Sequence, residues 1–529
     1  MREAHDVAAV RAAEGELMAA LPSGALMQRA AAGLASVCAT LLGRVYGAQV
    51  VVLTGSGDNG GDALYAAAGL ARRGAAVLAV AAGSRTHEGG AATLRASGGR
   101  IVTSGDPAVE PAISQAALII DGMLGIGGKG GLREPQAGLA VQAARSAATV
   151  VAVDLPSGID AGTGAVDGPA VRADVTVTFG TWKPGLLIDP GAAHAGVAEL
   201  VDIGLRPHLG AATVAAAQAA DVATMLPAPT ADSDKYRRGV LGVVSGSEQF
   251  TGAAVLSVGG AIHGGAGMVR FVSARPAVDV VRQWWPETVI TPLPAEPAGG
   301  GGRWQHTAAE DFLASAGRVQ AWVAGPGMGT GADSAALLRA VLQTDLPVLV
   351  DADGLTILAE HRDLLPRPAP TLITPHAGEL ARLTGADRAD IEAQRLQHAR
   401  AAARQLGVTV LLKGSTTVIC PPPGEGTGPD LVNSTGTPWL ATAGTGDVLS
   451  GLAGSLLAQG LEPARAALAA AFLHGVAARR AAAGDPASGG PADGAAVDEA
   501  GDGSVLDGAP IGAADVVRAL PGAIRAVKA

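Results

Sequence analysis

The sequence predicts an α/β protein of two domains whose sheets are mostly parallel. Short runs rich in Val, Ile and Leu alternate with Ala-rich runs of helical periodicity along the whole chain. This alternation is typical of parallel strands that are connected by helices. The chain has 529 residues, which is more than one ordinary domain core holds. A segment of prolines and polar residues without periodicity, LPAPTADSDKY at 226–236, separates two series of such runs.

Each run is assigned to a strand or a helix by its length and residue types. In the first half a helix is predicted over 60–74, and strands over 49–55, 75–83, 99–105, 117–125, 148–158, 173–180 and 197–204. In the second half strands are predicted over 239–247, 320–327, 347–353, 370–376 and 408–415, and helices over 332–343, 390–407 and 511–528. Residues 484–508 are rich in Gly, Pro and Asp and are expected to form a disordered surface insertion.

The charge and cysteine content limit the class of function. The formal net charge of −10 argues against a broad nucleic-acid surface, which needs clustered Lys and Arg. Cys38 and Cys420 are too few for a disulfide framework. The N-terminus lacks the apolar core of a signal peptide, and the longest uncharged run, between Glu248 and Arg270, is interrupted by His263 and glycines. We therefore expect a cytoplasmic protein that spans no membrane.

Three glycine-bearing loops follow predicted strands in the first half. They are TGSGDNGGD at 54–62, DGMLGIGGKGG at 121–131 and DLPSG at 154–158. Ligands of open α/β sheets bind at the carboxyl ends of strands, where glycines let the backbone approach a phosphate and a helix N-terminus supplies free N–H groups. The loops are therefore expected to converge on one site. Asn59, Asp121 and Ser157 offer oxygen atoms of the kind that holds a hard cation, although an aspartate at such a place is as often a helix cap or a turn residue.

These loops resemble those of the NAD(P)H-hydrate epimerases, in which three strands are followed by G-N-N-G-G-D, D-x-x-x-G-x-G and D-x-P-S-G. The resemblance covers about residues 1–210, including ALMQRAAAG at 25–33 and FGTWKPGL at 179–186. It departs at Asp58, where the family usually has asparagine, and this adds a negative charge beside a phosphate-bearing ligand.

The epimerase resemblance implies a role for each of these residues. Asn59, Asp121 and Ser157 would bind potassium. Epimerisation at C6 of the hydrated nicotinamide needs acid–base groups near the ring, for which Asp154 and Lys183 are the candidates. The implied contacts with the hydrated dinucleotide are Asp58, Asn59, Gly60, Gly61, Asp62, Gly125, Ile126, Gly127, Gly128, Lys129, Gly130, Gly131 and Asp154.

The most informative stretch of the second half is NSTGTPWLATAGTGDVLSGLAGSLLAQG at 433–460. Its GTGD segment at 444–447 opens an amphipathic helix, so its backbone N–H groups are expected to form an anion hole for a transferring phosphoryl group. Asp447 beside that hole is placed to accept a proton from an attacking hydroxyl. The alternative is that Asp447 only belongs to a helix capped after a glycine turn.

This stretch resembles the NAD(P)H-hydrate dehydratase branch of the ribokinase superfamily. GPGMG at 325–329, TPHAGE at 374–379 and KGSTT at 413–417 occur in the family's order, within a resemblance over about 225–480 and again in the last helix. Ala377 replaces a proline and Thr437 an asparagine, and neither substitution lies within the GTGD segment. The resemblance implies that substrate contacts Ala253, Gly327, His376 and Asp447, and that nucleotide contacts Lys413, Gly414, Ser415, Thr416, Thr417 and Gly446.

Together the resemblances imply a Rossmann-like three-layer domain over 1–210, a linker over 211–234 and a ribokinase-like three-layer domain over 235–529. The implied activity is nicotinamide cofactor repair. The first domain would epimerise the R and S hydrates of NADH and NADPH with potassium, and the second would dehydrate the S form with ADP and Mg²⁺, giving AMP and phosphate. A homo-oligomer is expected.

Two alternatives remain open. One is a small-molecule kinase that uses ATP on a sugar or vitamin alcohol, because that reaction also begins with a hydroxyl attacking a phosphoryl group. The other is an N-terminal half that only binds or scaffolds, with catalysis confined to the C-terminal half.

Overall fold

The computed structural model of the chain describes residues 1–529 apart from 129, 294–305, 425–427 and 485–507. Lys129 and all but the two end residues of the predicted insertion at 484–508 therefore lie outside the described residues. The chain divides into two compact units, an N-terminal one that contains residues 2–215 and a C-terminal one formed mainly by residues from 216 onward.

A seven-stranded sheet forms the centre of the N-terminal unit, and each neighbouring pair of its strands is parallel. Every strand predicted in this half is present. Their buried residues are mostly Val, Ile, Leu and Ala, as expected of strands that are covered on both faces. The order across the sheet is β4 (Arg100–Thr103), β3 (Ala76–Ala81), β2 (Gln49–Thr54), β5 (Leu118–Gly122), β6 (Thr149–Val153), β7 (Val175–Phe179) and β8 (Val197–Val201).

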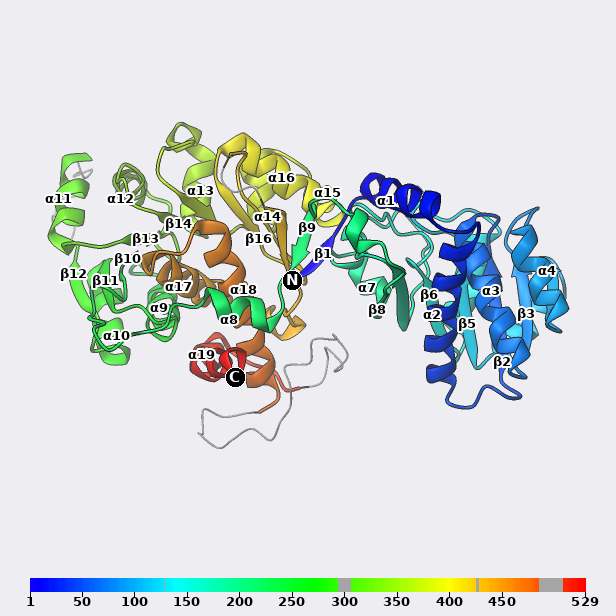
Figure 1. Cartoon of the computed structure of the whole chain (residues 1–529). Helices are drawn as coiled ribbons and strands as arrows, with labels where there is room; N and C mark the ends of the chain where they lie inside the picture. Colours follow the sequence, from blue (N-terminus) through cyan, green and yellow to red (C-terminus); the bar gives the residue numbers. More distant parts are fainter. Residues whose placement is uncertain (129, 294–305, 425–427, 485–507) are drawn as a thin grey trace. The chain divides into compact units, whose positions relative to one another are not determined.

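Alternate residues of the strands face two separate apolar cores, so the unit has three layers. The helices are α1 (Val7–Ala20), α2 (Ala25–Leu42), α3 (Asp58–Arg72), α4 (Glu88–Ala96), α5 (Val109–Gln115), α6 (Gln136–Arg145) and the short α7 (Ala192–Ala195). Val50 and Val52 pack into the core under α1 to α4, whereas Val51 and Leu53 pack into the core under α5 and α6. Figure 1 shows α2 and α3 side by side on one face of the sheet. The Rossmann-like three-layer arrangement is thereby confirmed.

The order of the strands reverses beside β2. The chain runs from β2 outward to β3 and β4 and then returns to β5 on the other side of β2. The carboxyl ends of β2 and β5 are neighbours there, since Thr54 pairs with Gly122. Ligands of parallel α/β sheets bind in the crevice at such a switch point. Two of the loops predicted to bind a ligand, at 55–57 and 123–131, follow these two strands.

The C-terminal unit contains a larger sheet that is parallel except at one side. The order of its strands is β18 (Asp430–Asn433), β17 (Thr417–Cys420), β16 (Thr409–Leu412), β15 (Thr371–Ile373), β14 (Val348–Val350), β13 (Ala321–Ala324), β10 (Val240–Val244), β11 (Met268–Ser273) and β12 (Val289–Pro292). β17 runs antiparallel to both β16 and β18. Only residues 413–416 connect β16 to β17, and a parallel crossover needs about a dozen residues. The chain therefore has to turn back on itself.

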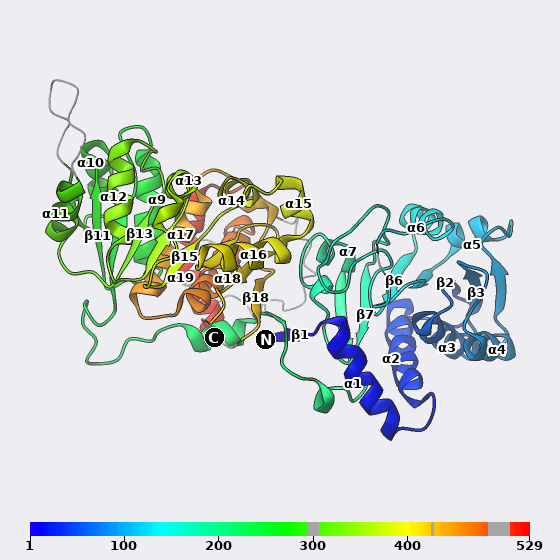
Figure 2. The same ribbon diagram turned by 90° about the horizontal axis from the view of Figure 1, so that it is seen from above.

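Two groups of helices cover the faces of this larger sheet. The helices are α9 (Thr251–His263), α10 (Arg275–Trp284), α11 (His306–Ala316), α12 (Ala332–Leu342), α13 (Asp353–Glu360), α14 (Ala377–Thr384), α15 (Arg388–Ala393), α16 (Arg395–Leu406), α17 (Thr445–Ala458), α18 (Pro463–Ala482) and α19 (Ala513–Lys528). In Figure 1, α12, α13 and α16 lie above the strands, and α9, α17 and α19 lie below them. Figure 2 views the unit from the side of the first group. The predicted three-layer arrangement is confirmed.

Two segments differ in detail from their predictions. The helix predicted over 390–407 is interrupted at Gln394, whose φ of −132° and ψ of 51° are not helical, so that α15 and α16 are separate helices. The segment 211–234, predicted as a linker, contains β9 (Val214–Ala216) and α8 (Ala219–Met225). Gln218 and Asp221 form a capping box that starts α8.

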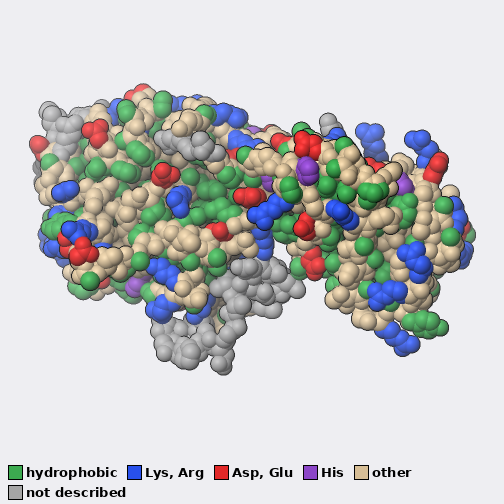
Figure 3. Space-filling model, in the orientation of Figure 1, with side chains coloured by type: hydrophobic (Ala, Val, Ile, Leu, Met, Phe, Trp, Pro, Cys, Tyr) green, Lys and Arg blue, Asp and Glu red, His purple; other side chains and the backbone are tan. Residues whose placement is uncertain are grey.

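Two further features of the fold concern the distribution of charged side chains on the surface and the packing of the most apolar helix. On the face drawn in Figure 3, Lys and Arg side chains are scattered among Asp and Glu rather than gathered by sign. Among the described residues one helix, α2, is long and apolar enough to cross a membrane by length and composition. It buries one side, including Leu34 and Cys38, in the core against α3. A helix that packs one apolar face into a core meets the same criteria.

Candidate active sites

The carboxyl ends of β2, β5 and β6 bring together the three residues predicted to hold a cation. Asp121 is fully buried, and its carboxylate accepts the backbone N–H of Ser157 at 2.8 Å and the Ser157 hydroxyl at 2.7 Å. The Asn59 amide and the Ser157 hydroxyl lie 3.0 and 3.2 Å from the carbonyl oxygen of Leu124. Burial raises the pKa of Asp121 to about 6, against the opposing effect of hydrogen bonds from Ser157 and Met123. The three side chains therefore meet at the start of the loop after β5.

Glycine is required where the loops meet α3. A Cβ on Gly60 would lie 2.4 Å from the carbonyl oxygen of Gly55, and a Cβ on Gly125 would lie 3.0 Å from the side chain of Asn59. A Cβ on Gly131 would lie 1.6 Å from the carbonyl oxygen of Asp167. The approach of Gly125 to Asn59 places the start of the loop after β5 beside the first turn of α3, whose free N–H groups attract anions.

Asp154 and Lys183 form a buried ion pair beside the end of β6. The Lys183 side chain is 1% exposed, and its Nζ lies 2.5 Å from Asp154 Oδ1. It also donates to Thr178 Oγ1 at 2.9 Å and to the carbonyl oxygen of Phe179 at 3.0 Å. Asp154 has a φ of 64°, a left-handed conformation that few residues other than glycine adopt. Surrounding contacts must hold such a conformation, which is commonest at functional sites.

A group of carboxyls surrounds this ion pair. The Oδ1 atom of Asp62 is buried and has no hydrogen-bond partner among the described residues. Burial, and then the charges of Asp154, Asp58 and Glu14, raise the pKa of Asp62 well above its ordinary value. Burial also raises the pKa of Glu14, against the opposing charge of Lys183. Shifted carboxyls that gather at the end of a strand are typical of an active site.

Asp351 is the centre of the polar cluster at the strand ends of the C-terminal unit. It follows β14, is 1% exposed, and accepts hydrogen bonds from Lys413 Nζ at 2.8 Å and from Ser450 Oγ at 2.6 Å. Burial is the largest influence on the pKa of Lys413 and lowers it, but the surrounding carboxylates together raise that pKa above its ordinary value. Lys413 is therefore charged, and Asp351 ties it to α17.

Asp447 lies in the first turn of α17, which begins after Gly444 without a side-chain cap. A Cβ on Gly446 would lie 3.5 Å from Lys413 Nζ, so the lysine is beside this turn. Burial, and then the charge of Asp351, raise the pKa of Asp447 to about 7, although Lys413 lowers it. A carboxyl with this pKa, next to a helix N-terminus and a lysine, suits proton transfer from a hydroxyl that attacks a phosphoryl group.

His376 has a structural role in addition to its predicted contact with substrate. Its Nδ1 accepts the backbone N–H groups of Gly378 and Glu379 at 3.0 and 3.2 Å, and the Glu379 carboxylate accepts the backbone N–H of His376 at 2.8 Å. This capping box starts α14. Burial lowers the pKa of His376, and the accepting Nδ1 places the ring proton on Nε2. The contact of His376 with substrate stays a prediction.

The structure also places the other residues predicted in this half. A Cβ on Gly327, whose φ is 61°, would lie 2.7 Å from the Cβ of Ala253, so these two positions are in contact. A Cβ on Gly414 would lie 2.1 Å from the Arg395 guanidinium. Thr417 begins β17 and is buried in the sheet. Of the 413–417 segment, Lys413 is thus the residue that the structure brings to Asp351 and Gly446.

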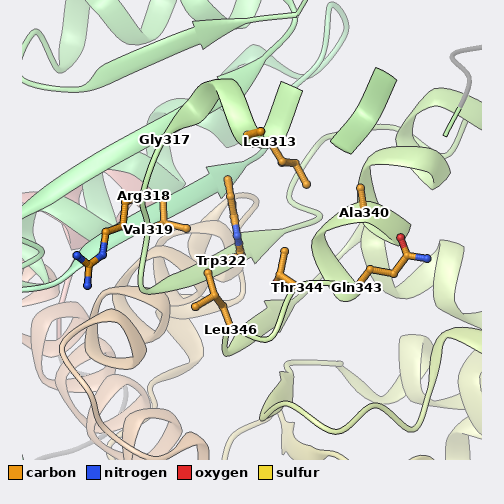
Figure 4. Close-up of a pocket in the computed structure, with 10 residues that line it drawn as sticks. Leu313, Gly317, Arg318, Val319, Trp322, Ala340, Gln343, Thr344 and Leu346 are labelled. Carbon is orange, nitrogen blue, oxygen red and sulfur yellow. The ribbon is translucent and has the colours of Figure 1, made fainter. Parts of the chain in front are cut away.

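A cavity of about 370 Å³ lies elsewhere in the C-terminal unit (Figure 4). Its lining includes Leu313, Trp322 and Gln343, from α11, β13 and the end of α12. None of the predicted site residues lines it, and the predicted GPGMG loop follows the other end of β13. The cavity is therefore separate from the cluster around Asp351.

Three residues of these clusters carry no sequence-based assignment to a site. Asp351 stands directly after a buried strand, as Asp154 does after β6. The signal at Ser450 is its spacing of four residues from Gly446, which puts both on one face of α17. Glu14 has no signal beyond its place in a helical pattern.

Comparison with known proteins matches both halves of the chain. Residues 23–185 match a family described as YjeF-related protein N-terminus, and residues 241–496 match a family described as NAD(P)H-hydrate dehydratase. A Mycobacterium tuberculosis protein named bifunctional NAD(P)H-hydrate repair enzyme Nnr is 48% identical over 473 residues, which cover 88% of this chain and 91% of that protein. The Mycobacterium leprae protein of the same name is 47% identical over 91% of this chain and 95% of its own length.

A more distant relative and one solved structure extend the comparison. The protein of the same name from Salinibacter ruber is 38% identical over 87% of this chain and 88% of its own length. A solved structure of ADP/ATP-dependent NAD(P)H-hydrate dehydratase from Bacillus subtilis, co-crystallised with ATP/Mg²⁺, is 25% identical with a TM-score of 0.45, and covers 59% of this chain and 97% of that one. The three relatives share one name and span both units of this chain.

Proposed function

This chain belongs to the family of bifunctional NAD(P)H-hydrate repair enzymes, and we propose on that premise that its units carry two successive steps of nicotinamide cofactor repair. The N-terminal unit interconverts the R and S hydrates of NADH and NADPH. The ribokinase-like C-terminal unit dehydrates the S form with ADP, giving the reduced cofactor, AMP and phosphate. The observation that carries the proposal is Asp447, whose pKa is raised to about 7 at the N-terminus of α17 beside Lys413.

In the N-terminal unit, Asp154 and Lys183 are the proposed acid–base groups. Inversion at C6 proceeds through ring opening and closing or through loss and return of the hydroxyl, and both routes move a proton near the ring. Asp154 takes and returns that proton, while Lys183 holds the carboxylate in place from its buried side. The start of α3 and the loop after β5 bind the dinucleotide through their backbone N–H groups.

Potassium fits the cluster of Asn59, Asp121 and Ser157. Asp121 is a fully buried carboxylate whose hydrogen bonds come from a neutral hydroxyl and two backbone N–H groups. A bound cation would offset the cost of burying this charge. Carboxylate, hydroxyl and amide oxygens are also the donors that hard cations prefer. The ion would neutralise part of the negative charge that a dinucleotide brings to the site.

We expect Asp121→Ala to weaken epimerisation at least about tenfold while leaving dehydration within about twofold of the parent chain. The variant removes the carboxylate that would hold the cation, and charge-assisted contacts of this kind are worth about 1.5–3 kcal/mol. Chiral analysis of the hydrate, with potassium titrated from zero, measures the change. Glu199→Ala, which removes an exposed carboxylate from β8 of the same unit, is the control. A parent chain whose epimerisation ignores potassium would contradict the metal assignment.

In the C-terminal unit, Asp447 deprotonates the C6 hydroxyl of the S hydrate. The alkoxide oxygen then attacks the terminal phosphoryl of ADP, and AMP leaves. Elimination of phosphate from C6, with loss of a proton from C5, forms the C5–C6 double bond of the reduced nicotinamide. The N–H groups at the start of α17 and the Lys413 ammonium stabilise the negative charge that develops on the transferring group.

Magnesium that accompanies ADP would find oxygen donors in this cluster. Asp353 and Glu379 supply carboxylates there, and Glu379 Oε2 lies 3.7 Å from Lys413 Nζ. Mg²⁺ is commonly held by one or two carboxylates together with phosphate oxygens. When bound, the ion supplies further charge stabilisation at the phosphoryl group.

Recovery of NADH absorbance from the S hydrate tests this proposal and the choice of nucleotide. We expect ADP to support repair far better than ATP, by at least about tenfold. The control is the same mixture without nucleotide, in which absorbance should not recover. Equal or faster recovery with ATP would contradict the choice of ADP. Phosphorylation of a sugar or vitamin alcohol without recovery of NADH would favour the kinase alternative.

Two further properties remain predictions. A cytoplasmic location agrees with the acidic composition and with relatives named as cofactor repair enzymes. The homo-oligomer is proposed from the family resemblance, and light scattering of the purified chain tests it.

A further inference from the structure

Arg11 of α1 is a cation of the N-terminal unit that the assigned site does not include. Its Nη2 lies 3.2 Å from the position that a Cβ on Gly127 would take, so the guanidinium rests against the loop after β5. The side chain is exposed, and no hydrogen bond or ion pair to it occurs among the described residues. A guanidinium that touches a glycine loop and has its donors unused is suited to meet an anion there.

α1 holds this residue in a defined place. Val10, Ala13 and Leu17 are buried in the core, and the Asp6 carboxylate caps the helix by accepting the N–H of Ala9 at 2.8 Å. The preceding segment is fixed as well, since β1 (Arg2–Ala4) pairs with Trp182 beside Lys183. In Figure 1, α1 lies crosswise to α2 and α3.

Glu14 lies on the same side of α1 as Arg11 and shows that this side faces the acid–base cluster. It lies three residues after Arg11, so the two side chains are neighbours on the helix surface. Glu14 interacts electrostatically with Lys183, Asp154 and Asp58, and the charge of Arg11 also acts on it. One face of α1 thus contributes Arg11 to the loop and Glu14 to the acid–base cluster.

The balance of charge at the site favours a cationic role for Arg11. A dinucleotide carries a negatively charged pyrophosphate, which charge-assisted hydrogen bonds from a cation would hold. Lys183 is buried and paired with Asp154, so it is not available to the phosphates. Asp58 lies in the first turn of α3 and offsets the positive end of that helix. The Arg11 guanidinium would compensate for the negative charges of the pyrophosphate and Asp58.

We propose that Arg11 binds a phosphate of the hydrated dinucleotide from the side of α1. The assignment rests on the proposed epimerase function and adds a third segment to the site, beside the start of α3 and the loop around Gly127. The planar guanidinium matches two phosphate oxygens with parallel N–H donors. Arg11 is a binding residue, because the phosphates are remote from the C6 atom at which the reaction occurs.

The test compares Arg11→Ala with Arg145→Ala, which removes an exposed arginine from the last turn of α6. Epimerisation of R-hydrated NADH by the full chain is followed by chiral analysis at several hydrate concentrations. Arg11→Ala should raise KM about tenfold or more and change kcat less than about twofold, because a charge-assisted contact with the ligand is lost. Arg11→Lys should recover part of the lost affinity, because lysine keeps the positive charge but lacks the two parallel N–H donors of arginine.

Ionic strength and the second activity provide independent readouts. KM of the parent chain should rise with salt more steeply than KM of Arg11→Ala, since salt screens exposed charges. Dehydration of the S hydrate with ADP should be unchanged in every variant.

An unchanged KM in Arg11→Ala would overturn the assignment, and so would an equal rise in Arg145→Ala. If Arg11→Ala lowers Tm or loses dehydration, Arg11→Gln, which keeps much of the side chain, replaces it in the same comparison. Absence of epimerisation in the parent chain would instead contradict the function proposed for the whole unit.

Discussion

Replacing Asp447 by asparagine should lower ADP-dependent dehydration at least about 100-fold. The substitution keeps the size of the side chain and removes the carboxylate that accepts the proton, and general-base catalysis contributes about 10²–10⁴-fold. α17 should persist, because Gly444 stands at its N-cap and no side chain caps it. Recovery of NADH absorbance measures dehydration. Epimerisation by the same preparation should be unchanged and serves as the internal control for folding.

The pH dependence of dehydration gives a second check on Asp447. Its pKa is raised to about 7, and the carboxyl is active only when it has lost its proton. kcat/KM should therefore increase as the pH rises through about 7 and then level off. In Asp447→Asn this limb should be absent from the residual activity. Near-normal repair by Asp447→Asn, with the limb retained, would show that another group takes the proton.

Replacing Lys183 by methionine should destabilise the N-terminal unit and lower epimerisation at least about 100-fold. The variant leaves the Asp154 carboxylate without its cation at a site where Lys183 is buried. Breaking a buried ion pair by removing one partner costs about 3–5 kcal/mol. Thermal unfolding measures the loss of stability. Lys528→Met is the control, because its ammonium lies at the exposed end of α19 and its loss should change stability by less than about 0.5 kcal/mol.

The double variant Asp154→Asn/Lys183→Met separates stability from chemistry. It removes both charges, so no carboxylate is left unpaired, and most of the lost Tm should return. Epimerisation should remain at least about 100-fold below that of the parent chain because the acid–base groups are gone. A double variant that regained both stability and epimerisation would show that the pair only supports the fold.

The strands and the loops that follow them can be predicted because each depends on a short stretch of sequence. ALIID predicts β5 and places Asp121 at its end, and VVAVD does the same for β6 and Asp154. Parallel strands end at one edge of a sheet, so the prediction that Asn59, Asp121 and Ser157 converge follows from their positions. The structure brings these three together. Their role as ligands of potassium stays a prediction.

Contacts between distant segments could not be predicted in the same way. Lys413 and Ser450 reach Asp351 across 62 and 99 residues of sequence. An acidic residue at a strand end has the same local sequence pattern whether it binds a ligand, caps a helix or pairs with a lysine. Which of these partners it meets depends on the order of the strands in the sheet. The antiparallel β17 likewise depends on the short turn at 413–416. Gln394 interrupts a helical pattern that shows no proline or glycine there.

Under the proposed contact between Lys413 and a nucleotide phosphate, the hydrogen bond between Asp351 and Lys413 makes nucleotide binding a competition. A phosphate that attracts Lys413 draws the ammonium away from a buried carboxylate, so the measured affinity reports the difference between two ion pairs. Lys413 also lowers the pKa of Asp447 while Asp351 raises it. Any displacement of the ammonium toward a phosphate therefore changes how strongly Asp447 holds its proton. On this proposal nucleotide binding and proton uptake are linked equilibria, and each shifts the other by the same free energy.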